Sequence, residues 1–333
     1  MSITKEQGKK IQILRGWAIL AVVAAHVLFG SPYELYINGW VNFCVGCFLF
    51  LSGFFIGEEH MTSLKGFYQK RMLRILIPYT FWSVVYTLYD RNFDRVIFRF
   101  LTGQCCSVYY YLFVYFQLLI LAPLLIKMMK TRLWWLPLVI TPLAIAVEYY
   151  LALKTEYLLI YPWNINNFAV WVLYFYAGIL VHAHPVTNDI KKIPYGLLLL
   201  GLILTYVFCV WENGAWLSFG RQDISTTSVK FSVIFWTGAI LLMFFRYMKD
   251  EEKTVGIIGS ILKYVGDASF GVYLIHQLVL SFLGRRNLLQ PHALVNYVVV
   301  MAASVALVLG VRVAVLAVSQ NIGKKVLQWI GFI

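Results

Sequence analysis

The sequence is poor in charge. Only 13% of its 333 residues are charged, 61% are apolar, and the mean hydropathy is +0.74. Soluble domains carry about 25% charged and about 45–50% apolar residues. Water therefore cannot be the main solvent of this chain, and a soluble globular domain is excluded.

Acidic residues are scarcer still. The chain has 28 Lys and Arg against 15 Asp and Glu, a formal net charge of +13. Such an excess would suit a nucleic-acid partner if the basic residues gathered into one stripe. Instead they recur in alternate connecting segments, such as residues 65–74 and 191–192, which is how membrane proteins encode topology. We therefore exclude nucleic acid as a partner.

Metal-binding patterns and repeats are also missing. Five cysteines is an odd number, none has a histidine at zinc-finger spacing, and Cys44 and Cys47 lie within an apolar stretch. We expect buried small side chains at these positions and no bound metal. The sequence has no low-complexity tract, heptad run or clear internal repeat, so a solenoid or coiled coil is not indicated.

Long apolar stretches are abundant. About ten of them approach or exceed the 17–25 residues, roughly, that cross a hydrocarbon core as a helix. They are predicted at residues 11–30, 40–57, 74–90, 108–126, 133–152, 167–183, 194–211, 229–246, 264–283 and 294–318. We predict an all-α polytopic transmembrane bundle of about ten helices, forming one domain over residues 1–333.

The distribution of basic residues predicts the orientation of this bundle. If the N-terminus is cytoplasmic, the inward segments hold most of the Lys and Arg, as the positive-inside rule requires. Both termini are then cytoplasmic in a plasma or inner membrane. The first stretch carries Arg15 and His26 and no small-residue cleavage site follows it, so we expect it to be retained rather than removed as a signal peptide.

Arg15 and His26 are ionisable side chains inside a predicted span. Each costs at least about 2.5–3.5 kcal/mol in hydrocarbon, so such residues mainly face a cavity or a partner. A separation of eleven residues places both on one helix face, about 16.5 Å apart along the axis. The structural alternative is an interfacial Arg with a His that bonds a neighbouring helix.

Four further ionisable residues lie at or inside predicted spans. Arg71 and Arg74 share a face at i and i+3, although ordinary positive-inside charge also explains them. Glu148 lies about as deep in the fifth span as His26 lies in the first. His276 lies in the ninth span, where hydrogen bonding between helices is the structural alternative.

Two arginine motifs carry a family resemblance. Arg15 and His26 are separated by ten residues, and Arg71 and Arg74 precede a proline and a tyrosine. This order and spacing resemble the acyltransferase-3 family of integral-membrane O-acyltransferases, of the bacterial surface-polysaccharide O-acetyltransferase type. Further segments that resemble the family are residues 48–55, 171–178 and 269–276. The family's ten-helix fold is implied as well.

The resemblance implies transfer of an acyl group, usually acetyl, from cytoplasmic coenzyme A to a hydroxyl of a cell-surface or lipid-linked glycan. Acetyl-CoA would be the co-substrate, with no metal. Coenzyme A is a polyanion, so Arg15, Arg71 and Arg74 are predicted to bind its phosphates at the cytoplasmic mouth.

The catalytic candidates are His26, Glu148 and His276. Neutral imidazole suits the removal of a hydroxyl proton at neutral pH, so His26 is the predicted general base. Glu148 is predicted to orient that imidazole, as carboxylates do in other acyl-transfer sites. His276 is the first substitute for His26 as the base.

The sequence contains no Gly-x-Ser-x-Gly nucleophile elbow. The Ser52-Gly53 pair lies in an apolar stretch, where small residues usually permit close helix packing. Direct transfer is therefore favoured, while a covalent acyl intermediate stays open. A transporter or flippase for a glycan intermediate is the competing function, since buried Arg, His and Glu also form substrate pathways. A non-catalytic scaffold in a glycan-assembly complex is the third function considered.

Overall fold

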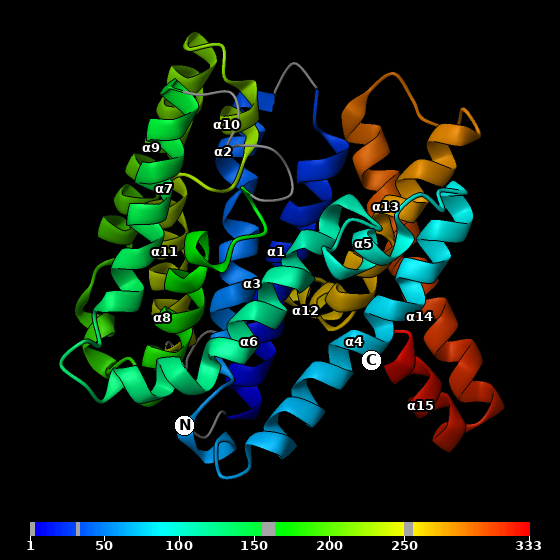
Figure 1. Ribbon diagram of the computed structural model, residues 1–333, viewed down its shortest axis with the longest axis horizontal. Helices are drawn as coiled ribbons and strands as arrows, with labels where there is room; N and C mark the ends of the chain where they lie inside the picture. Colours follow the sequence, from blue (N-terminus) through cyan, green and yellow to red (C-terminus); the bar gives the residue numbers. More distant parts are fainter. Residues whose placement is uncertain (1–3, 31–33, 155–163, 250–255) are drawn as a thin grey trace. The chain divides into compact units, whose positions relative to one another are not determined.

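The structure, a computed structural model, describes residues 4–30, 34–154, 164–249 and 256–333 (Figure 1). Every secondary-structure element in these ranges is a helix, which confirms the predicted all-α class. The α-helices are α1 (Lys5–Val27), α2 (Glu34–Val41), α3 (Phe43–Phe54), α4 (Leu64–Asp90), α5 (Val96–Leu101), α6 (Tyr110–Met129), α7 (Leu136–Lys154), α8 (Val172–Ala183), α9 (Tyr195–Ser218), α10 (Gln222–Thr226), α11 (Phe231–Met248), α12 (Ile257–Asp267), α13 (Ser269–Arg285), α14 (Ala293–Val318) and α15 (Gln320–Trp329). Short 3-10 helices are η1 (Glu58–His60), η2 (Ser107–Tyr109), η3 (Phe168–Val170) and η4 (Asn188–Lys192).

The helices include many that can cross a membrane. By length and composition seven spans qualify among the described residues, and eight if α12 and α13 count as one bent span. Each of the ten predicted spans nevertheless coincides with helix. The number of qualifying spans is lower than ten partly because α8, with 12 residues, is too short. α4 is long enough but too polar, because it carries Arg71 and Arg74 in one half and several tyrosines and threonines in the other.

The ninth predicted span, near residues 264–283, is broken rather than straight. α12 and α13 meet at an angle of 75° at Ala268. The break follows Gly266, whose backbone lies so close to α1 that an added methyl group would overlap the carbonyl oxygen of Gln12. The small residues here allow α12 to follow α1 while α13 turns away from the direction of α12.

The chain groups into two compact units. Unit one comprises Met1–Phe48 and His184–Val305, and unit two comprises Leu49–Ala183 and Ala306–Ile333. α3 and α14 contribute residues to both. The prediction of a single domain over residues 1–333 stays a prediction.

Unit one is built around α1. α1 packs along α12 and also contacts α13 and α2, while α9 and α11 lie side by side in Figure 1. The contact of α1 with α12 is made by backbone, because Gly16 faces the carbonyl of Leu262 as Gly266 faces that of Gln12. The glycine of the Leu14-Arg15-Gly16 motif therefore fixes how α1 is rotated against its neighbour.

Unit two contains a second crossing of this kind. Gly53 of α3 faces the carbonyl oxygen of Phe175, and Gly178 of α8 faces that of Phe50. A methyl group at either glycine would overlap the backbone of the other helix. The expectation that Ser52-Gly53 permits close helix packing is confirmed. This crossing also holds the end of α3 beside the end of α8.

All five cysteines are free and buried, as predicted. Cys47 and Cys209 have no exposed surface.

Candidate active site

α1 holds Arg15 and His26 on one continuous helix. It begins at a capping box in which the Thr4 side chain accepts from the backbone of Gln7, and it runs unbroken to Val27. The predicted arrangement of Arg15 and His26 on one helix face is confirmed by this continuity. Both side chains are half-buried, and His26 lies in the last turn of α1.

His26 lies beside His276. The centroids of the two imidazole rings are 5.5 Å apart and their planes are inclined by 38°. His276 comes from α13 and is fully buried, with the ring of Tyr273 6.3 Å away. The α1–α12 crossing and the bend at Ala268 thus bring together two histidines that are 250 residues apart in the sequence.

The hydrogen bonds of His276 assign its tautomer. Nδ1 lies 3.1 Å from the carbonyl oxygen of Val272 and 2.9 Å from that of Tyr273. Carbonyl oxygens only accept, so Nδ1 carries the proton, and Nε2 of the neutral ring is a bare acceptor. Within the described residues, Nε2 is buried and has no hydrogen-bond partner. A buried acceptor without a donor is costly, so a donor is expected to reach it.

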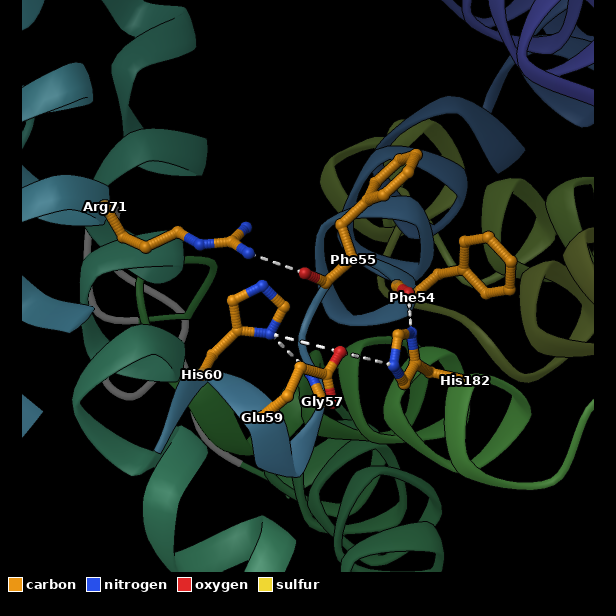
Figure 2. A network of polar contacts seen from close by, with 7 residues as sticks. All are labelled: Phe54, Phe55, Gly57, Glu59, His60, Arg71 and His182. Atoms are coloured by element: carbon orange, nitrogen blue, oxygen red, sulfur yellow. Dashed lines mark hydrogen bonds and ion pairs between the residues drawn. The ribbon is translucent and has the colours of Figure 1, made fainter. Parts of the chain in front are cut away.

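Arg71 lies in a separate polar cluster, within unit two (Figure 2). Its guanidinium donates a hydrogen bond to the carbonyl oxygen of Phe55, at an N···O distance of 2.6 Å. Arg74, one turn further along α4, is exposed. The bond to Phe55 uses one donor of a guanidinium that has five.

His182, in the last turn of α8, binds the carbonyl group of Phe54 at the end of α3. Its Nδ1 lies 2.8 Å from the carbonyl oxygen of Phe54, and its Nε2 lies 3.0 Å from Oε1 of Glu59 (Figure 2). The Nδ1 atom of His60 is 3.5 Å from the same Oε1, but it accepts from the backbone N–H of Gly57 and so has no proton to donate. Glu59 therefore pairs with His182.

Glu59 is ionised at neutral pH. Burial opposes its charge, but hydrogen bonding from its own backbone and the charge of His182 outweigh burial and lower the pKa of Glu59. A lowered pKa stabilises the fold above the pKa of the unfolded chain, and this stabilisation is lost as the pH falls through the folded value. Since the Glu59 side chain is 58% exposed, the contribution is small.

Glu148 lies half-buried on α7 in unit two, whereas His26 and His276 belong to unit one. Its predicted role in orienting His26 stays a prediction. The predicted donor-binding residues divide in the same way, with Arg15 in unit one and Arg71 and Arg74 in unit two.

Sequence reasoning missed two polar clusters. One is the His182–Glu59 pair, whose members look like ordinary charges at helix ends. The other is the fully buried Lys230, which donates to the amide oxygen of Asn213 and, at 2.6 Å, to the carbonyl of Ser225. Glu212 beside it accepts from the first turn of α11. α9 extends beyond the predicted span of residues 194–211, so Glu212 and Asn213 lie inside a helix. Two consecutive polar residues in that position were the sequence signal for this cluster.

Long apolar helices and a pair of neighbouring histidines define a polytopic membrane protein with ionisable groups inside its spans. The sequence pattern of the acyltransferase-3 family, described as an acyltransferase domain, matches residues 9–313. The chain belongs to this family, which makes it a membrane acyltransferase. No curated protein and no solved structure matches the chain. The polysaccharide subtype stays a prediction.

Proposed function

We propose that this acyltransferase moves an acyl group, acetyl in the expected case, from cytoplasmic acyl-CoA to a hydroxyl of a cell-surface or lipid-linked glycan. The contact of the half-buried His26 with the buried His276 is the observation that carries the proposal. A hydroxyl is a poor nucleophile until its proton is removed, and a neutral imidazole is suited to removing it. His276 supplies the buried acceptor that can hold the ring of His26 in one orientation.

In this mechanism the N–H of His26 is donated to Nε2 of His276, and the other ring nitrogen of His26 takes the proton of the acceptor hydroxyl. The hydroxyl oxygen forms a bond to the thioester carbonyl carbon. The carbon–sulfur bond then breaks, and the leaving sulfur takes the proton from His26. The histidine pair returns to its starting state, so no covalent enzyme intermediate is needed.

Three arginines are proposed to hold the donor. Arg15 stands on the same face of α1 as His26, about 16.5 Å away, a span that the pantetheine arm of coenzyme A can cover. Arg71 and Arg74 share a face at the N-terminal half of α4. Planar guanidinium groups bind phosphate oxygens through several donors at once, which suits a ligand with several phosphates.

The direct test is transfer of radiolabelled acetyl from acetyl-CoA to isolated membranes or surface glycans that contain the protein. Label in the glycan that is released by mild base supports an O-acyl ester. A transporter or flippase for a glycan intermediate would move its substrate without coenzyme A. Transport that proceeds equally without acetyl-CoA, with no label transferred, would replace this proposal with that function.

Topology can be tested separately. Reporters placed after Ile333 and near Lys65 are expected to read cytoplasmic, and a tag near Gly220 is expected to read external, because the basic residues favour that orientation. A tag near Pro32, which lies outside the described residues, is also expected to read external. An external reading at Ile333 would contradict the predicted number of spans.

Replacing Arg71 or Arg74 by Lys is expected to raise the apparent KM for acetyl-CoA about tenfold, with the acceptor KM little changed. Lys keeps the charge that orients α4 but loses the planar set of donors. Kinetics in nanodiscs measure both constants. Arg132→Lys, at an exposed position, is the matched control. If all three variants and the parent have the same KM for acetyl-CoA, then Arg71 and Arg74 do not bind the donor and serve only as positive-inside charges.

A further inference from the structure

A histidine and an arginine side chain bind consecutive carbonyl groups at the end of α3. The last four carbonyls of an α-helix have no partner within the helix, and cations are favoured there. Here His182 of α8 binds the carbonyl of Phe54, and Arg71 of α4 binds that of Phe55 (Figure 2). The end of α3 is therefore the shared attachment point of two side chains from different helices.

The contacts of His182 require a doubly protonated ring. Both partners, the Phe54 carbonyl and the Glu59 carboxylate, only accept hydrogen bonds, and they lie 2.8 and 3.0 Å from the two ring nitrogens. A neutral imidazole has one N–H and could donate to only one of them. The His182 side chain is only 11% exposed, so water would poorly replace the lost bond.

Gly57 leaves the space that the pair occupies. A methyl group on Gly57 would overlap Nε2 of His182 and Oε2 of Glu59. The turn after α3 thus brings its backbone against the ion pair, and a side chain at Gly57 would displace the pair. The other charged groups of this cluster are already paired: Glu58 binds Lys130 at 2.6 Å.

We propose that His182 is a positioning residue for Arg71 and that it acts through the end of α3. The inference rests on the proposed function, in which Arg71 binds the acyl donor. Loss of the second proton from His182 would leave the Phe54 carbonyl or the Glu59 carboxylate facing a lone pair. The turn after α3 would then shift, and the Phe55 carbonyl that anchors Arg71 would shift with it.

The consequence is a donor affinity that depends on the charge and the position of the His182 ring. The groups that face His182 or its partner are Glu59, His60 and the two carbonyls, with Lys130–Glu58 and Arg71 nearby. Glu59 is ionised at neutral pH, so it needs a donor on the facing ring nitrogen of His182. Removing the charge of His182, or displacing the pair, is therefore expected to raise the donor KM.

The test uses the full-length protein in nanodiscs, with the KM for acetyl-CoA, kcat and equilibrium binding of coenzyme A measured at neutral pH. His182→Gln removes the charge, and Gly57→Ala keeps every charge but displaces the pair. His182→Lys keeps a cation that can donate to both acceptors. His184→Gln is the control, because His184 is exposed two residues further along the chain.

His182→Gln and Gly57→Ala are expected to raise the donor KM about five- to tenfold with kcat within about twofold. His182→Lys should keep the donor KM close to the parent's, because the cation beside the two acceptors is retained. His184→Gln should match the parent. Gly57→Ala tests the geometry with all charges retained. If His182→Gln fails to fold, the KM of Gly57→Ala therefore still tests the inference.

Two outcomes count against the inference. If the parent binds coenzyme A, and folded His182→Gln and Gly57→Ala both show the parent's KM for acetyl-CoA, then His182 does not position Arg71, and the proposed function stands. If the parent itself neither binds nor uses acetyl-CoA, the proposed function fails, and the inference about donor affinity fails with it.

Discussion

His26→Ala is expected to lower acyl transfer by about 10²–10⁴-fold, the usual effect of losing a general base. The variant should still fold and insert, because removing a half-buried imidazole creates no buried charge. The loss should appear in kcat, while equilibrium binding of coenzyme A changes little, because His26 acts on the hydroxyl proton rather than on the phosphates. Radiolabel transfer by purified protein in nanodiscs measures kcat, and equilibrium binding of coenzyme A measures the affinity for the donor.

His292→Ala is the control for this experiment. His292 is exposed, and its backbone carbonyl accepts hydrogen bonds from the N–H groups of Val295 and Asn296. Its removal should leave the rate unchanged. If His26→Ala keeps the parent's rate in a protein that is folded and monodisperse, the base lies elsewhere. His276 is then the first candidate, because its Nε2 is the buried acceptor beside the same site.

Gly16→Ala is expected to destabilise the protein by about 1–3 kcal/mol, because the new methyl group would overlap the carbonyl oxygen of Leu262. A backbone carbonyl held in a helix cannot rotate away as a flexible side chain can. α1 would have to move off α12, which would also separate His26 from His276. Thermal unfolding in detergent measures the stability, and acyl transfer should fall in parallel.

Gly8→Ala is the matched control on the same helix. Nothing lies within 4 Å of a methyl group at Gly8, so the change should be neutral or stabilising by up to about 1 kcal/mol through helix propensity. Equal thermal stability of Gly16→Ala and Gly8→Ala would show that α1 and α12 do not pack through their backbones.

Much of the fold could be predicted from the sequence, because apolar length and helical periodicity are local properties. The helix that carries Arg15 and His26 was predicted in this way. The bend at Ala268 could not be, since an apolar window looks the same whether the helix is straight or broken. The contact of Gly266 with α1 lies far outside any local window.

The candidate site was predictable only in part. His26 and His276 stand out because ionisable residues are costly in hydrocarbon. Their contact depends on how α1 crosses α12, which glycine positions set and composition does not. His182 and Glu59 gave no signal, because a charge at a helix end is ordinary. Only the meeting of segments more than 120 residues apart makes them a pair.

The buried Lys230 bears on how the chain enters the membrane. Its ammonium group is satisfied by Asn213 and Ser225, with the carboxylate of Glu212 nearby, and these partners lie on α9 and α10. A free lysine or glutamate in lipid is costly for a helix that inserts alone. During synthesis α9 would therefore be retained at the translocon until α11 emerges, and the two helices would leave it as one preassembled hairpin.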